Sequence, residues 1–197
     1  MAGATVLVSA RHAVGVAVCL VLVVVLTGCA GWSTVEGSSR ENAEQGIAVS
    51  TEYLAMGLVD RALEPGRSFS AESLSTLTEH VLLEPDKQSV EGLRRAKTVY
   101  GLSSDADSIT IDVYVGTTSS VNAGLYSEST DLFGCGSLRA DLVTREVELE
   151  DEICPEWIRG WGGDDTEETS LEETITRQGG KTTWGYPEED PPGQPVS

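Results

Sequence analysis

The first half of the sequence places apolar residues at helical spacing. Ser38 to Glu41 (SSRE) resembles an N-terminal capping box, and an apolar stripe with intervals of four or seven residues follows it. Pro65-Gly66 cannot continue a helix, so the pattern predicts one helix that ends there. The stripe consists of Ile47, Leu54, Leu58 and Ala62.

Two shorter helical segments are predicted next. Ser70 is a favourable N-cap residue, and Leu74, Leu77 and Val81 would share one face of a helix that ends before the following proline. Residues 87–95 predict a short third helical piece.

The apolar period then changes to two, which is typical of strands. From Ile109 to Val115 apolar and polar residues alternate. Lys97 to Leu102 can pair with this strand across a turn at Ser103–Asp107, although its spacing also suits a helix. A further strand is expected within 123–133. The pattern predicts an α+β domain in which two or three helices precede four or five antiparallel strands.

A hairpin is predicted at the end of this sheet. Segments 136–143 and 146–153 both alternate, and Thr144-Arg145 lies midway between them. Folding there pairs residues whose numbers sum to 289, so Arg139 would face Glu150. Thr-Arg is a poor two-residue turn, which leaves a four-residue loop as the alternative.

The cysteines fit this hairpin. In the same register Cys135 faces Cys154, and opposed residues of an antiparallel pair lie within reach of a disulfide. We therefore predict a structural disulfide between them that closes a loop of about 20 residues and stabilises the fold by ~3 kcal/mol. The other two cysteines, Cys19 and Cys29, lie in the N-terminal segment.

That N-terminal segment carries an export signal. Arg11 precedes fourteen uncharged apolar or small residues, Ala13 to Leu26, which are too few to span a bilayer but suit the core of a signal peptide. Leu26, Thr27, Gly28 and Cys29 follow as Leu-Thr-Gly-Cys. This tetrapeptide resembles a lipobox, the processing signal of bacterial lipoproteins. An uncleaved membrane anchor and an ordinary signal peptide are the alternatives.

The resemblance covers about the first 29 residues and implies a location. It implies cleavage before Cys29, acyl chains on the Cys29 thiol, and a membrane-anchored protein on the extracytoplasmic face. Residues 1–28 would be the signal peptide, and 29–39, small and polar, a flexible tether. Ten Arg against three Lys, with abundant Ala, Gly and Val, resembles an actinobacterial composition.

Composition narrows the possible partners. Arg11 is the sole charged residue of 1–28, so cleavage of the signal peptide would change the formal charge of the chain from −19 to −20. Such a surface repels nucleic acid and anionic lipid headgroups, and leaves cations and basic peptides possible. The stretch from Gly160 on is acidic, rich in Gly and Pro and poor in aliphatic residues, so 159–197 is predicted to be a disordered tail. The globular domain would then span 40–158.

The search for chemistry finds no catalytic, metal or cofactor motif. His80 is the one histidine after Cys29 and is expected on an exposed helix face. Asp105, Asp107 and Asp112 could ligate calcium, but turn formation by the first two is favoured because no calcium-loop spacing follows. The acidic runs Glu148–Glu152 and Asp164–Glu168 are expected to be solvated. Of the tryptophans in this region, Trp157 is expected to pack under the hairpin, and Trp161 and Trp184 to lie on the tail.

Three functions remain. The first is a non-catalytic envelope lipoprotein whose domain binds a cell-surface protein or a small ligand. The second is a hydrolase of wall polymers that uses a pair of carboxylates, which any acidic protein can supply. The third is a structural spacer whose acidic tail reaches into the wall. The first hypothesis is preferred because the nucleophile–base pairs of hydrolases are missing from the sequence.

Overall fold

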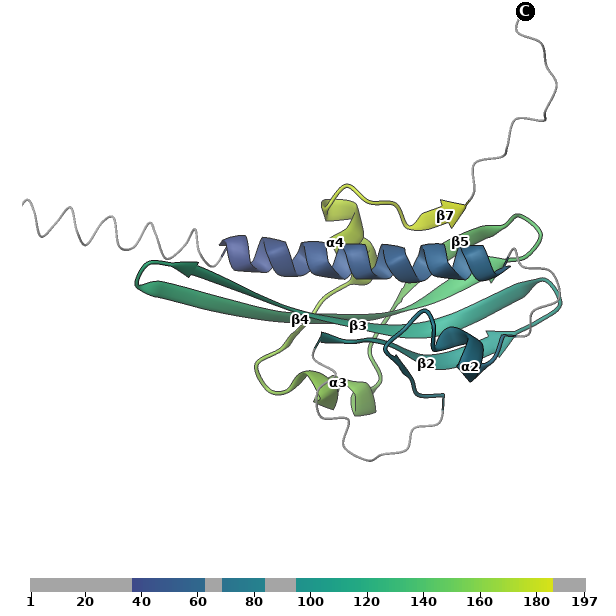
Figure 1. The fold of residues 1–197 in the computed structure, drawn as a ribbon, viewed down its shortest axis with the longest axis horizontal. Helices are drawn as coiled ribbons and strands as arrows, with labels where there is room; N and C mark the ends of the chain where they lie inside the picture. The colour runs from purple at the N-terminus through teal and green to yellow at the C-terminus, as the bar shows by residue number, and fades with distance from the viewer. Residues whose placement is uncertain (1–36, 63–68, 84–94, 186–197) are drawn as a thin grey trace, which may run out of the picture. The chain divides into compact units, whose positions relative to one another are not determined.

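A computed structural model describes residues 37–62, 69–83 and 95–185. One long helix spans residues 37–62, and a seven-stranded sheet with three short helices follows (Figure 1). The lipobox, the tether up to residue 36 and most of the predicted third helical piece lie outside the described residues. In chain order the later elements are α2 (Ala71–Leu74), β1 (His80–Val81), β2 (Lys97–Ser104), β3 (Ser108–Ala123), β4 (Tyr126–Asp141), β5 (Glu146–Glu152), α3 (Glu156–Gly162), β6 (Glu167–Glu168), α4 (Leu171–Arg177) and β7 (Thr183–Gly185).

The long helix covers one face of the sheet with its predicted stripe. Ile47, Leu54 and Leu58 are fully buried and belong to a core that the odd-numbered apolar residues of β3 complete from below (Figure 1). Its first described turn, 37–39, was predicted as the end of the tether and the start of the capping box, and is already helical. Within the described ranges, no helix is both long enough and apolar enough to cross a membrane.

The predicted second helix is wrong beyond its first turn. Ser70 is its N-cap, as expected, and exchanges hydrogen bonds with Ser73 in a capping box. The helix ends after Leu74, and Val81 lies instead in β1. The hydroxyls of Ser75 and Thr76 bond back to carbonyls three residues earlier, a local pattern that competes with continued helix.

The sheet is mixed rather than antiparallel. Its order is β1-β2-β3-β4-β5-β7, with β6 on β4, and the short strands β1 and β6 pair in parallel with β2 and β4. Lys97 to Ser104 form a strand, which settles the ambiguity of that segment. β3 and β4 form a long hairpin whose turn is Gly124-Leu125; Gly124 has φ +66°, a conformation that favours glycine. At the end of this hairpin the hydroxyls of Ser120 and Ser129 are hydrogen-bonded.

The β4–β5 hairpin has the four-residue loop, and its register differs from the predicted one. Paired numbers sum to 287, so Arg139 faces Glu148 and Cys135 faces Glu152. Asp141 fixes this turn because its carboxylate accepts hydrogen bonds from the amides of Val143 and Thr144. A shift of two residues leaves every side chain on its predicted face.

The cysteines nevertheless meet. Cys154 lies two residues past the end of β5, and the chain there turns back over the sheet toward β4. Cys135 and Cys154 form a disulfide with Cα atoms 5.1 Å apart, and both are 2% exposed. The predicted pairing is therefore present, but between a strand residue and a loop residue rather than across the ladder.

The predicted disordered tail is wrong for residues 159–185. Here β6, α4 and β7 pack on the domain, and Leu171, Ile175 and Trp184 are buried in the same core as the long helix. Gly134 makes room for this segment, since a Cβ on it would lie 2.5 Å from a Leu171 methyl carbon. The prediction of disorder from average composition failed because the three large apolar residues of this segment are widely spaced along the chain but enter one core.

Leu171 tests the position of this segment. We expect Leu171→Ala to lower the free energy of unfolding by about 2–4 kcal/mol, because it leaves a cavity in the core. Leu125→Ala is the matched control, since Leu125 is fully exposed at the hairpin turn and its loss should have little effect. Urea denaturation of both variants measures the difference; equal stabilities would contradict the packed arrangement.

Candidate functional site

The second face of the sheet holds a small aromatic core. Tyr114 on β3 and Phe133 on β4 are stacked with ring centroids 5.8 Å apart, and Trp161 of α3 meets Tyr114 edge-on at 5.5 Å. Ile158 and the disulfide complete this second core. α3 covers the face of the sheet opposite the long helix, and we call it the α3 lid (Figure 1). β3 and β4 are therefore buried on both faces here.

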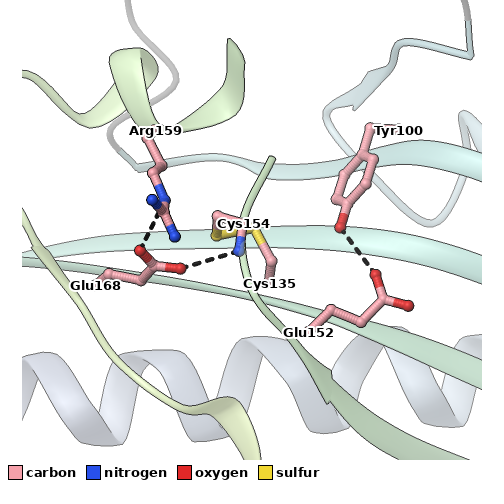
Figure 2. The surroundings of a disulfide bond; sticks show 6 residues. All are labelled: Tyr100, Cys135, Glu152, Cys154, Arg159 and Glu168. Carbon is pink, nitrogen blue, oxygen red and sulfur yellow. Dashed lines mark hydrogen bonds and ion pairs between the residues drawn. A yellow bond between two sulfur atoms is a disulfide. The ribbon is translucent and has the colours of Figure 1, made fainter. Parts of the chain in front are cut away.

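α3 is held in place at its start. Cys154 precedes it and is joined to β4, and the Cys154 amide donates a 2.9 Å hydrogen bond to Glu168 on β6. The other oxygen of Glu168 pairs with Arg159 of α3 at 3.1 Å (Figure 2). A covalent bond and a bridging carboxylate thus fix the position of the helix on the sheet.

An aromatic pair lies at the edge of this lid. The rings of Trp157 and Tyr100 are perpendicular, with centroids 5.9 Å apart, and Trp157 remains 40% exposed. Ile153, the first residue after β5, is 81% exposed. The Tyr100 hydroxyl donates a 3.4 Å hydrogen bond to Glu152 (Figure 2).

The described charged side chains that act on Tyr100 are the carboxylates of Glu152 and Asp112. Burial raises the pKa of the half-buried Asp112. Burial and then the negative charge of Asp112 raise the pKa of Glu152, and the charge of Glu150 adds to this effect. Burial, Glu152 and Asp112 together also raise the pKa of Tyr100 well above its usual value. The two described charges that shift the pKa of Glu152, those of Asp112 and Glu150, are therefore both negative.

A glycine makes the approach of Asp112 to β2 possible. Gly101 faces Asp112 directly, just after an irregularity in the strand register at Val99. A Cβ on Gly101 would lie 1.8 Å from an Asp112 carboxylate oxygen. The Asp112 carboxylate therefore lies over the backbone of β2 at Gly101, the residue next to Tyr100.

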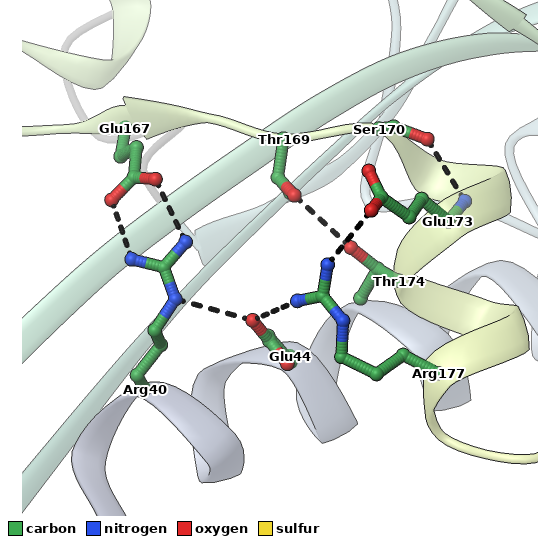
Figure 3. Close-up of polar contacts among 8 residues, drawn as sticks. All are labelled: Arg40, Glu44, Glu167, Thr169, Ser170, Glu173, Thr174 and Arg177. Atoms are coloured by element: carbon green, nitrogen blue, oxygen red, sulfur yellow. Dashed lines mark hydrogen bonds and ion pairs between the residues drawn. The ribbon is translucent and has the colours of Figure 1, made fainter. Parts of the chain in front are cut away.

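A second polar cluster joins the long helix to the C-terminal segment. Arg40 makes two 2.8 Å hydrogen bonds to Glu167, and the buried Glu44 accepts from Arg40 at 3.2 Å and from Arg177 at 2.7 Å (Figure 3). Arg177 also pairs with Glu173 at 3.2 Å. Each of the three carboxylates in this cluster is paired with at least one of the two arginines, which is typical of a structural network.

The other predicted residues lie apart. His80 is exposed, as expected, but it lies in strand β1 and not on a helix. Its side chain forms no hydrogen bond or ion pair with another described residue. Asp105 accepts hydrogen bonds from the Asp107 and Ser108 amides in the β2–β3 turn, so these aspartates form a turn, and Asp112 lies elsewhere on β3. Trp184 is buried, contrary to its predicted place on a tail.

The acidic run Glu148–Glu152 places its side chains on both faces of β5. Glu148, Glu150 and Glu152 point away from the long helix, because Val147 and Leu149 of the same strand are in the helix-side core. Asp151 accepts hydrogen bonds from Ser170 and from the Glu172 amide at the start of α4. In the described part of the chain, no group of three His, Cys, Asp or Glu side chains is arranged to hold a metal ion.

Sequence reasoning missed the combination of Tyr100, Asp112 and Glu152. Each lies on a different strand, and no spacing within one strand indicates the other two. The polar Asp112 inside an otherwise apolar alternation was the available signal. Comparison of the chain with protein families, with curated proteins and with solved structures gives no significant match, so the site is judged on its geometry alone.

The raised pKa of Asp112 has a testable consequence for stability. A carboxyl whose pKa is higher in the folded state destabilises the fold above that pKa, and the penalty disappears as the pH falls below the unfolded value. We expect Asp112→Asn to raise the melting temperature near pH 7 and to give no gain near pH 3. Thermal unfolding followed by circular dichroism at both pH values measures this.

Asp105→Asn is the matched control. Hydrogen bonds from the Asp107 and Ser108 amides and the Ser108 hydroxyl lower the pKa of Asp105, so its charge stabilises the fold at neutral pH. The control should therefore lower the melting temperature near pH 7, and the loss should shrink as the pH falls. Shifts of the same sign in both variants would contradict the assignment of an uncompensated charge at Asp112.

Proposed function

We propose that this chain is an exported bacterial lipoprotein, held by acyl chains on Cys29 at the extracytoplasmic face of a membrane. The Leu-Thr-Gly-Cys lipobox after an uncharged apolar segment carries the proposal. The buried disulfide between Cys135 and Cys154 supports it, because such bonds persist in oxidising compartments. The composition favours an actinobacterial source.

The domain behind the anchor acts as a non-catalytic binding module. The observation that supports this role is the exposed Trp157 ring, which packs against the half-buried Tyr100 beside Asp112 and Glu152, whose described charged neighbours are negative. A partner in the cell envelope, either a protein or a small ligand, can satisfy both features at once. The net charge argues against nucleic acid as that partner.

The alternative of a wall-polymer hydrolase rests on Asp112 and Glu152. They are a carboxylate pair with raised pKa values, the property that a general acid needs. Against it, Glu152 is exposed on an open strand, and a general acid works best where water is excluded. We therefore prefer binding to hydrolysis. The spacer alternative loses support because residues 163–185 pack on the domain instead of extending from it.

The anchor is tested by two cysteine variants in the natural host. Cys29→Ala should lose incorporation of labelled fatty acid and leave the membrane fraction, because the thiol that carries the lipid is gone. Cys19→Ala, ten residues earlier in the apolar segment, should keep both label and location. The readouts are autoradiography, membrane fractionation and the mass of the mature N-terminus. A Cys29→Ala protein that stays in the membrane and uncleaved would refute the lipid anchor.

A further inference from the structure

An apolar patch lies open at the edge of the α3 lid. Ile153 is 81% exposed and Trp157 40% exposed, although both flank the buried Cys154. The Trp157 ring keeps this exposure while it contacts Tyr100 and, at a centroid distance of 5.2 Å, Trp161. The neighbouring rings hold Trp157 in position, so its free surface is a preformed platform for a ligand.

Negative charge borders this patch on two sides. Glu152 and Asp112 lie on the sheet side, linked to the patch through Tyr100, and the exposed Glu156 precedes Trp157 in α3. Glu150 on the same face of β5 contributes to the field at Glu152. The half-buried position of Asp112 shields it from solvent, so its charge acts more strongly on its neighbours than a fully solvated carboxylate would.

Two described arginines, one on α3 and one on β4, face other carboxylates. Arg159 of α3 pairs with Glu168 on the side of the lid toward β6. Arg139 faces Glu148 across the β4–β5 ladder, and its charge lowers the pKa of Asp105 and Asp141 at the other end of the strand. The patch therefore combines an exposed indole with a negative potential that the described side chains leave unbalanced.

We propose that this patch binds a basic peptide segment, with one lysine ammonium or arginine guanidinium against the Trp157 ring and within reach of Glu152. The proposal rests on the binding role given above and names its partner class. An indole is the aromatic ring that cations prefer, and a carboxylate beside it adds direct charge neutralisation. The net charge of the chain also accelerates the approach of a cationic partner and suppresses anionic ones.

A neutral sugar is the competing occupant, because sugars also stack on tryptophan. It would leave the charges of Asp112 and Glu152 uncompensated and would bury them further. A cation relieves the same repulsion on binding. The charge pattern therefore favours the basic peptide, and the sugar becomes an outcome of the experiment.

The test titrates hexalysine into the purified full-length chain by calorimetry, with chitohexaose and hexaglutamate as comparison probes. Glu152→Gln and Trp157→Leu should each weaken hexalysine binding at least about fivefold. Glu148→Gln is the matched control, since it removes the same charge from the same face of β5 and should change the affinity by less than about twofold. Chitohexaose and hexaglutamate should not bind.

A second measurement keeps the test decisive if Trp157→Leu fails to fold. In the unaltered protein with labelled indole nitrogens, hexalysine should shift the NMR signal of Trp157 and leave that of Trp184, which is buried in the other core, unchanged. Equal weakening by Glu152→Gln and Glu148→Gln, an unmoved Trp157 signal, or binding of chitohexaose instead would each overturn the proposal. If the chain purified from its natural host carried no acyl groups on Cys29 but still bound hexalysine, the anchor alone would be refuted and this site would stand.

Discussion

The central constraint of this fold is a sheet that is apolar on both faces at its middle. Residues 132–138 of β4 are buried without interruption, so both faces of the strand must be covered. The long helix covers one face with the stripe that includes Ile47 and Leu54. The other face depends on α3, a helix of seven residues that has little stability of its own and is held by the disulfide and by Glu168.

The sequence predicts the regular parts of this arrangement and fails where tertiary contacts decide. Local periodicity predicts the helical stripe and the strand from Ile109 to Val115. The pairing of Cys135 with Cys154 follows because they are the two cysteines outside the N-terminal segment. Periodicity does not predict the hairpin register, because the Asp141 carboxylate selects a four-residue loop. The second helix fails for a similar reason, since local hydroxyl bonds end it after one turn.

The C-terminal segment shows the limit of composition as evidence. Residues 163–185 are acidic and rich in glycine, yet Leu171, Ile175 and Trp184 are buried completely or nearly so, and Gly134 on β4 leaves the space that Leu171 fills. The candidate site is a related case. Tyr100, Asp112 and Glu152 come together only when the four strands β2 to β5 are in register, so periodicity along any single strand could not indicate the site. Its aromatic part, Trp157, was expected under the hairpin and lies half-open at the edge of the lid.

The ion pairs of Glu44 join residues that are 133 positions apart, from the first turns of the long helix to the end of α4. The domain core is therefore incomplete until α4 has been synthesised. If the chain is exported as proposed, a polypeptide whose α4 is still inside the translocation channel cannot make this ion pair. The ion pair of Glu44 with Arg177 and the disulfide of Cys154 with β4 would then both form in the destination compartment.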